Sequence, residues 1–251
     1  MGWQRVGRGT ALLLVVVATA TGCSDSKTPS LAAPGSGAST TAAPSDEDAD
    51  RSTVAEALVP RVAVFDSEGA TVPSQSIVQP ADPPRPMVFL VVEEHPALWL
   101  EVLLPVRPNG RTGWIKATDV RLTEHSYRMT INLTDHLLTV TQSKRVLLTA
   151  PIGVGTATTP TPGGLYYTKE LLRPPRPDGV YGPYAYGLSG FSNELTTFDG
   201  GDGVIGIHGT NDPAGLGKDV SHGCIRIPNA EIVKLVEQIK LPLGVPVQVI
   251  A

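Results

Sequence analysis

Glycine and proline interrupt this chain at short intervals, and this spacing limits which regular elements can form. The two residue types account for 26 and 23 of the 251 positions. Apolar residues make up 41% of the chain, enough for a core, but they occur in short runs between turn residues. Short runs rich in Val and Leu without a helical period are typical of strands. The sequence therefore predicts a mostly β protein with many turns and at most one or two helices.

The runs fall into two groups, which predict two folded domains. The first is a small all-β domain, barrel- or sandwich-like, over residues 56–123, with a hairpin turn at Asn109-Gly110. The second covers 126–251. There, alternating polar and apolar residues from Tyr127 onward predict an antiparallel meander with one buried face. Apolar spacing after Asn229, a plausible N-cap, predicts a helix that ends before Pro242.

A segment rich in Gly and Pro, Arg173 to Ser192, interrupts the second domain. Its composition predicts a long loop, and a loop of this length in a compact domain is commonly a functional lid. Its aromatic residues either line a groove for a peptide or pack the loop down, and the sequence leaves both open. They are Tyr181, Tyr184, Tyr186 and Phe191.

The N-terminal segment has the features of an export signal. Arg5 and Arg8 precede a short apolar stretch, and Ala20-Thr21-Gly22-Cys23 resembles a lipobox. We expect a signal peptide over 1–22 with lipidation of Cys23, against plain cleavage or an uncleaved anchor. The Ser/Thr/Pro/Ala-rich stretch 23–55 is expected to be a flexible linker.

The residues with the clearest chemistry lie near the C-terminus, in IHGTNDP (207–213) and SHGCIR (221–226). Cysteine attacks as thiolate, and a nearby imidazole lowers the thiol pKa and moves protons. If 221–227 is extended, then His222, Cys224 and Arg226 share one face. Gly209 and Gly223 let backbone N–H groups approach a substrate carbonyl. This pattern predicts a cysteine acyl-transfer centre.

These residues also allow two other interpretations. A lone cysteine is usually a small buried apolar residue. If Cys23 is lipidated, however, Cys224 is an unpaired thiol in an oxidising compartment, which favours a chemical role. A zinc site would draw on His208, His222, Cys224 and Asp212, but neither CxxC nor HExxH spacing supports it. With net charge −4 and no phosphate-binding loop, neither nucleic acid nor a metal or organic cofactor is expected.

The run IHGTNDPAGLGKDVSHGCIRIPN is similar to the signature of the L,D-transpeptidase (YkuD-type) family. The upstream Gly153-Val154-Gly155 and Thr159-Pro160-Thr161-Pro162-Gly163 also resemble that family's GxG…TPTPxG element, and the resemblance covers roughly 126–250. It implies an enzyme that cross-links or trims peptidoglycan stem peptides through a cysteine thioester. It also implies inactivation by carbapenem-type β-lactams.

The resemblance also implies residue roles. Cys224 would be the nucleophile and His208 the proton donor and acceptor, whereas His222 either assists or only packs. Ser221 would hydrogen-bond His208 or the loop, and the N–H groups of Gly223 and Cys224 would hold the oxyanion. Substrate-binding residues would be Arg226, Gly209 and Thr210.

The expected reaction joins a tetrapeptide donor stem to a diaminopimelate-bearing acceptor, releasing D-Ala and forming a 3→3 cross-link. The enzyme would be lipid-anchored outside the cytoplasmic membrane. Alternatives are an L,D-carboxypeptidase, a transferase to a D-amino acid or a protein, and a non-catalytic wall-binding lipoprotein. The segment from Trp99 to Ile115 weakly resembles a bacterial Src-homology-type barrel, for which either wall contact or a spacer role is open.

Overall fold

The computed structural model describes residues 50–80, 84–95, 98–198 and 200–251, all within one compact unit, Ala43–Ala251. The expected signal peptide 1–22, the lipidation site Cys23 and most of the expected linker lie outside the described residues. No helix in the described part of the chain is long and apolar enough to cross a membrane.

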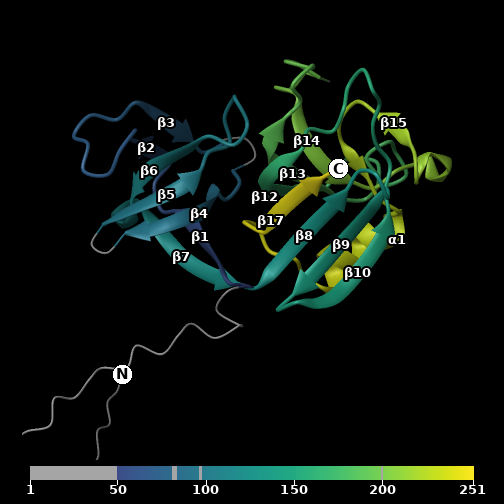
Figure 1. The fold of residues 1–251 in the computed structure, drawn as a ribbon, viewed down its shortest axis with the longest axis horizontal. Helices are drawn as coiled ribbons and strands as arrows, with labels where there is room; N and C mark the ends of the chain where they lie inside the picture. The colour runs from purple at the N-terminus through teal and green to yellow at the C-terminus, as the bar shows by residue number, and fades with distance from the viewer. Residues whose placement is uncertain (1–49, 81–83, 96–97, 199) are drawn as a thin grey trace, which may run out of the picture. The chain divides into compact units, whose positions relative to one another are not determined.

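The first group of strands forms a five-stranded antiparallel sheet with the order β6-β5-β4-β1-β7 and a separate β2-β3 hairpin (Figure 1). A bridge between Phe65 and Trp114 joins the hairpin to the sheet, and apolar side chains from both enclose one core. The strands are β1 (Ser52–Ala57), β2 (Arg61–Val64), β3 (Gln75–Val78), β4 (Val88–His95), β5 (Trp99–Leu103), β6 (Thr112–Lys116) and β7 (Val120–His125).

The start of this domain corrects one expectation. Residues 52–55, assigned to the linker, belong to β1, which pairs with β4 and with β7. Val54 and Ala55 are buried there, so the strand contributes apolar side chains to the core although the sequence before it is largely polar. The hairpin expected at Asn109-Gly110 is present between β5 and β6.

The second group forms an eight-stranded sheet, β10-β9-β8-β17-β12-β13-β14-β16. A parallel pair, β11 with β15, lies outside it. The strands are β8 (Tyr127–Asn132), β9 (Leu137–Gln142), β10 (Arg145–Pro151), β11 (Val154–Gly155), β12 (Gly164–Leu172), β13 (Ala185–Phe191), β14 (Val204–His208), β15 (Asp219–Ser221), β16 (Ile225–Arg226) and β17 (Pro246–Ile250).

The mostly β fold with little helix is as expected. The helix α1 (Asn229–Val233) continues as a π-helical turn over Lys234–Gln238. Pro228, not Asn229, occupies the N-cap position. The Asn229 amide oxygen accepts a hydrogen bond from Thr210 N–H (2.8 Å) and does not cap the helix.

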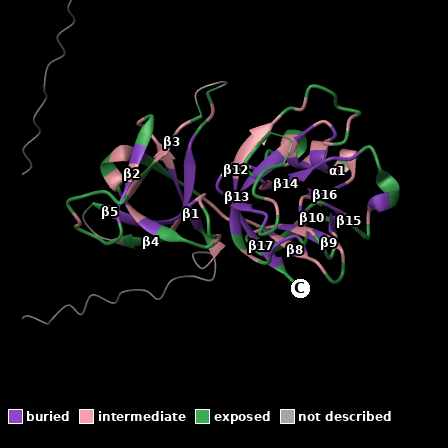
Figure 2. Cartoon of the chain, turned by 90° about the horizontal axis from the view of Figure 1, so that it is seen from above, coloured by how far each residue is buried: buried purple, intermediate pink, exposed green. Residues whose placement is uncertain are grey.

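The expected long lid over 173–192 is only partly a loop. Its second half is β13, a strand between β12 and β14 that is among the most buried of the sheet (Figure 2). The glycines that suggested a loop are needed for packing. A Cβ on Gly190 would lie 2.3 Å from the Tyr166 ring, and one on Gly187 would lie 2.8 Å from the Glu170 side chain. Neighbouring side chains therefore cross the strand where these residues have none.

Candidate active site

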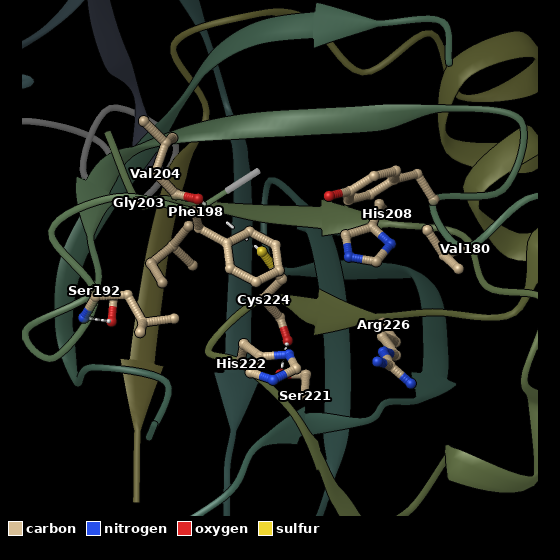
Figure 3. A pocket seen from close by; sticks show the side chains of 13 residues that line it. Val180, Ser192, Phe198, Gly203, Val204, His208, Ser221, His222, Cys224 and Arg226 are labelled. Atoms are coloured by element: carbon tan, nitrogen blue, oxygen red, sulfur yellow. Dashed lines mark hydrogen bonds between the residues drawn. The ribbon is translucent and has the colours of Figure 1, made fainter. Parts of the chain in front are cut away.

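Cys224 and His208 are brought together by two neighbouring parallel strands. His208 is the last residue of β14, and β16 begins one residue after Cys224; the register pairs Ile207 with Ile225. Figure 3 shows His208, Cys224 and Arg226 turned toward the same space. The core residues Ile205, Ile207 and Ile225 are buried beneath the site, so both side chains extend from strands that are packed into the core.

The imidazole of His208 is buried and its tautomer is determined by one hydrogen bond. Nδ1 lies 2.6 Å from the carbonyl oxygen of Gly209, which can only accept, so Nδ1 carries the proton and Nε2 has a free lone pair. Burial lowers the pKa of His208 to about 4, and the positive charge of Arg226 acts in the same direction. His208 is therefore neutral at pH 7 and competent to accept a proton. The Tyr181 ring packs edge-on against it, with centroids 5.0 Å apart.

The thiol of Cys224 is also held in its neutral form. Burial raises its pKa, against the opposing effects of a hydrogen bond from the Gly206 backbone and the charge of Arg226. Sγ also lies 4.0 Å from the carbonyl oxygen of Val204, to which the thiol can donate. The expectation that the imidazole lowers the thiol pKa is thus wrong for this resting geometry, because desolvation dominates.

The loop carrying Cys224 is not one extended strand. Gly223 adopts φ +115°, which ends β15 and turns the chain before β16. Ser221 closes this turn, because its Oγ donates to the carbonyl of Cys224 (2.6 Å) and accepts from Gly223 N–H (3.0 Å). Ser221 is therefore bonded to the loop rather than to His208. Gly223 N–H is engaged in this turn and is not free for an oxyanion, which leaves the N–H of Cys224.

His222 takes a different position from the other site residues. It is exposed, and its ring packs against Phe198 with centroids 5.3 Å apart. Its side chain forms part of the wall of the cavity beside Cys224 and makes no hydrogen bond to the thiol. Arg226 lies in the same cavity with its guanidinium 3.7 Å from the Asp212 carboxylate.

Gly209 and Thr210 do not line the cavity. A Cβ on Gly209 would lie 2.2 Å from the Asn229 side chain, so that Gly209 is required for a close approach of backbone to helix. The hydroxyl of Thr210 accepts from Asp212 N–H (3.0 Å) and shapes the turn after β14. The structure gives both residues a role in the turn that leads away from His208.

Two upstream threonines support the loop of Cys224 through hydrogen bonds. Thr161 Oγ1 accepts from Gly155 N–H and donates to the carbonyl of Gly223, both at 2.9 Å. Thr159 Oγ1 donates to the carbonyl of Ser221 (3.3 Å). The sequence placed these residues in a rigid turn, but only the fold shows that the turn supports the loop of Cys224.

Two cavities meet at Cys224. The first is about 240 Å³ and contains His222 and Arg226; the second is about 450 Å³ and contains Arg173, Pro174 and Asp202. Both are lined by His208, Cys224 and Tyr181. Of the other loop aromatics, Tyr184 and Tyr186 are buried with their hydroxyls bonded to Glu237 and to the Leu241 carbonyl, and Phe191 lies under Arg107. Tyr181 is thus the one of the four that faces both cavities.

The zinc interpretation finds no support in this geometry. Among residues 50–80, 84–95, 98–198 and 200–251, no three His, Cys, Asp or Glu side chains are close enough to hold a metal ion. His222 faces Phe198, and Asp212 faces Arg226, so the four proposed ligands do not converge.

Comparison with known proteins places the second domain in a family. The YkuD L,D-transpeptidase catalytic-domain model matches residues 126–249. The YkuD protein of Bacillus subtilis is 37% identical over 109 residues, which cover 43% of this chain and 58% of that protein, so the chain spans little more than half of its relative. The YqjB protein of the same species is 39% identical over 80 residues, which cover 32% of this chain and 40% of that protein.

Solved structures that the chain matches include L,D-transpeptidases. One from Enterococcus faecium is 22% identical with a TM-score of 0.38, over 49% of each chain. L,D-transpeptidase 3 of Mycobacterium tuberculosis, in complex with a faropenem-derived adduct, is 16% identical with a TM-score of 0.41, over 56% of this chain and 73% of that one. Residues 126–249 of the chain therefore form a catalytic domain of the YkuD-type L,D-transpeptidase family.

Proposed function

We propose that this protein is a cysteine-dependent L,D-transpeptidase in which Cys224 is the nucleophile and His208 the base. The observation that carries the proposal is the pairing of a neutral imidazole, with Nε2 free, and a half-buried thiol on adjacent parallel strands beside two cavities. A general base must be unprotonated before it can accept a proton, and burial keeps His208 in that form at neutral pH.

In the proposed first step, His208 Nε2 takes the thiol proton as Sγ attacks the carbonyl between diaminopimelate and the terminal D-Ala of a tetrapeptide stem. The oxyanion accepts a hydrogen bond from Cys224 N–H. When the intermediate collapses, the C–N bond breaks, the imidazolium returns its proton to the leaving amine, and D-Ala departs. A thioester on Cys224 remains. Generating the thiolate only as attack proceeds fits a site in which both partners are neutral at rest.

In the second step, the side-chain amine of an acceptor stem attacks the thioester and His208 takes its proton. The C–S bond breaks, and the thiolate is reprotonated by His208. The product is a 3→3 cross-link. Two cavities that share Cys224 give separate approaches for the donor and the acceptor. We assign the donor to the cavity with Arg226, whose guanidinium can pair with a substrate carboxylate once it leaves Asp212.

Ser221, Gly223 and His222 are proposed as positioning residues of this site. Ser221 and Gly223 set the turn that presents Cys224, and His222 with Phe198 forms part of the cavity wall. We do not assign substrate contacts to Gly209 or Thr210, because neither lines either of the two cavities at Cys224.

A peptidoglycan substrate requires a place outside the cytoplasmic membrane. We propose that the folded part acts there, anchored through lipidated Cys23. The second candidate activity is an L,D-carboxypeptidase, in which water replaces the amine. This activity is favoured by the larger cavity, because its lining includes the solvent-exposed Asp202 and water can therefore reach it. A protein side chain or free D-amino acid as acceptor would use the same thioester.

The test is the intact mass of the protein after incubation with a carbapenem, with Cys224→Ala as control. We expect an adduct on the wild type alone. Tetrapeptide muropeptides are then supplied, and the appearance of a cross-linked dimer identifies a transferase, whereas tripeptide alone identifies a carboxypeptidase. No adduct and no acyl-enzyme with either reagent would leave the wall-binding lipoprotein as the better description.

A further inference from the structure

The loop between β5 and β6 of the first domain makes its main polar contacts with the second domain. Arg107 donates three hydrogen bonds to backbone carbonyls there. Nη1 donates to Ser192 (2.6 Å), and Nη2 donates to Leu195 (3.0 Å) and to Asp202 (2.8 Å). One guanidinium thus ties together the beginning, the middle and the end of a single irregular segment, which we call the wall segment (192–198 and 200–203).

A second residue of the same loop makes a matched pair of contacts. Asn109 Nδ2 donates to the carbonyl of Phe191 (2.8 Å), and Asn109 Oδ1 accepts from Phe191 N–H (2.9 Å). The side chain thereby continues the hydrogen-bond pattern of a strand at the end of β13. The Arg107 guanidinium also lies over the Phe191 ring, 4.8 Å from its centroid. The two residues hold the wall segment where it leaves the sheet.

The wall segment forms one side of the smaller cavity at Cys224. Ser192, Leu195, Phe198 and Gly203 all line it, and the Phe198 ring packs on His222 (Figure 3). Apart from the Phe198–Gly201 bridge, the segment has little regular structure of its own. Its internal bonds run to Ser192: Oγ accepts from Leu195 N–H (3.0 Å), and the Ser192 N–H donates to Gly203 (2.8 Å).

The segment is also tightly fitted around the arginine. A Cβ on Gly203, which has φ +69°, would lie 2.1 Å from the Leu195 carbonyl and 3.2 Å from Arg107 Nη2. A lysine at 107 has one ammonium on a flexible stem and cannot reproduce a planar fork that reaches three carbonyls at once. The contact is therefore specific to arginine and to this backbone path.

We infer that Arg107 and Asn109 are positioning residues for the active site: the first domain holds the wall segment so that Phe198 and Leu195 close the donor cavity beside Cys224. This inference rests on the proposed function for its catalytic consequence, but its structural part stands on the hydrogen bonds alone. It gives the first domain a role in catalysis beyond that of a spacer or a wall-binding module.

The test compares Arg107→Ala and Arg107→Lys with Arg111→Ala in the full chain. Arg111 has the same charge, lies on the same loop and is exposed. We expect Arg107→Ala to lower kcat/KM for cross-linking of tetrapeptide muropeptides by about 10- to 100-fold, as small displacements of substrate-positioning groups do. Arg107→Lys should fall between, and Arg111→Ala should match the wild type. Alkylation of Cys224 by iodoacetamide, which needs no peptide cavity, should not slow in any variant.

Equal kcat/KM for Arg107→Ala and Arg111→Ala would overturn the inference. If Arg107→Ala does not fold, Asn109→Asp decides: it keeps the acceptor for Phe191 N–H but places a carboxylate oxygen against the Phe191 carbonyl, and unchanged kcat/KM would again overturn the inference. If the wild type forms no acyl-enzyme, the proposed function fails. The structural part of the inference is then tested by amide hydrogen exchange, which needs no activity. Faster amide exchange at Leu195 and Phe198 in Arg107→Ala than in Arg111→Ala would support the inference that Arg107 holds the wall segment. Equal exchange in the two variants would reject it.

Discussion

At the scale of single residues, the site is a pair of neutral groups rather than a preformed ion pair. His208 has its pKa lowered to about 4 by burial, while burial raises the pKa of Cys224. Iodoacetamide reports the fraction of thiolate directly. We therefore predict that alkylation of Cys224 keeps rising with pH beyond the range in which an ordinary cysteine has ionised. A rate that is already maximal near pH 6 would instead indicate a thiolate–imidazolium pair.

The two histidines of the motif are predicted to differ in importance. His208→Gln removes the imidazole whose tautomer is held with Nε2 free, and loss of a general base typically costs ~10²–10⁴-fold in rate. His222→Gln removes a ring that packs on Phe198 and should cost much less. Acyl-enzyme formation with muropeptides, followed by mass, measures both. Equal losses would mean that His222 moves protons in the complex.

At the scale of elements, the parts that sequence could predict are those whose contacts are local. The hairpin β5-β6 and the meander β8-β9-β10 pair neighbours along the chain, and their alternating pattern and turn residues predicted them. β17 instead pairs in parallel with β8, more than a hundred residues earlier, and no local pattern encodes that partner. β13 was missed because its glycines are dictated by Tyr166 and Glu170 on the neighbouring strand.

The same distinction explains the outcome for the candidate site. The residue types and spacing of His208 and Cys224 were sufficient to identify both as candidates, since their chemistry is carried by the side chains themselves. Roles that depend on a hydrogen bond to the backbone could not be predicted from the sequence. Gly223 N–H donates to Ser221 Oγ, and Thr161 bridges two loops. The bond from Thr161 Oγ1 to the Gly223 carbonyl joins residues 62 positions apart, beside the pairing of β11 with β15.

The Thr161 bridge carries a prediction at this scale. Thr161→Val keeps the shape of the side chain but leaves Gly155 N–H and the Gly223 carbonyl without their buried partner, at about 1–3 kcal/mol. We expect a lower denaturation midpoint together with slower acylation of Cys224, because the strained turn at Gly223 loses its support. Thr158→Val, at an exposed position of the same turn, is the control and should change neither. A loss of stability with unchanged acylation would limit Thr161 to a role in folding.

At the scale of the whole molecule, residues from both sheets form one apolar cluster. The Tyr167 ring of β12 is fully buried against Val54, Val88, Leu90 and Leu103 of the first sheet. A cluster of this kind couples the unfolding of the two sheets, because neither can lose its fold without exposing the other's apolar surface. The hydrogen bonds from Arg107 to the wall segment also join the first domain to the second.

Tyr167 tests this coupling. Tyr167→Ala removes the ring that both sheets cover and should cost ~3–5 kcal/mol. The tryptophans of the first domain, Trp99 and Trp114, report its unfolding by fluorescence in a Trp3→Phe background, and labelling of Cys224 reports the second. In the wild type we expect one shared midpoint, and in Tyr167→Ala two separate ones.

Tyr167→Phe is the matched control: the hydroxyl is buried with no hydrogen-bond partner among the described residues, so its removal should leave stability equal or raise it by up to about 1 kcal/mol. Two midpoints already in the wild type would show that the sheets unfold independently, and the first domain would then influence the site only through Arg107 and Asn109.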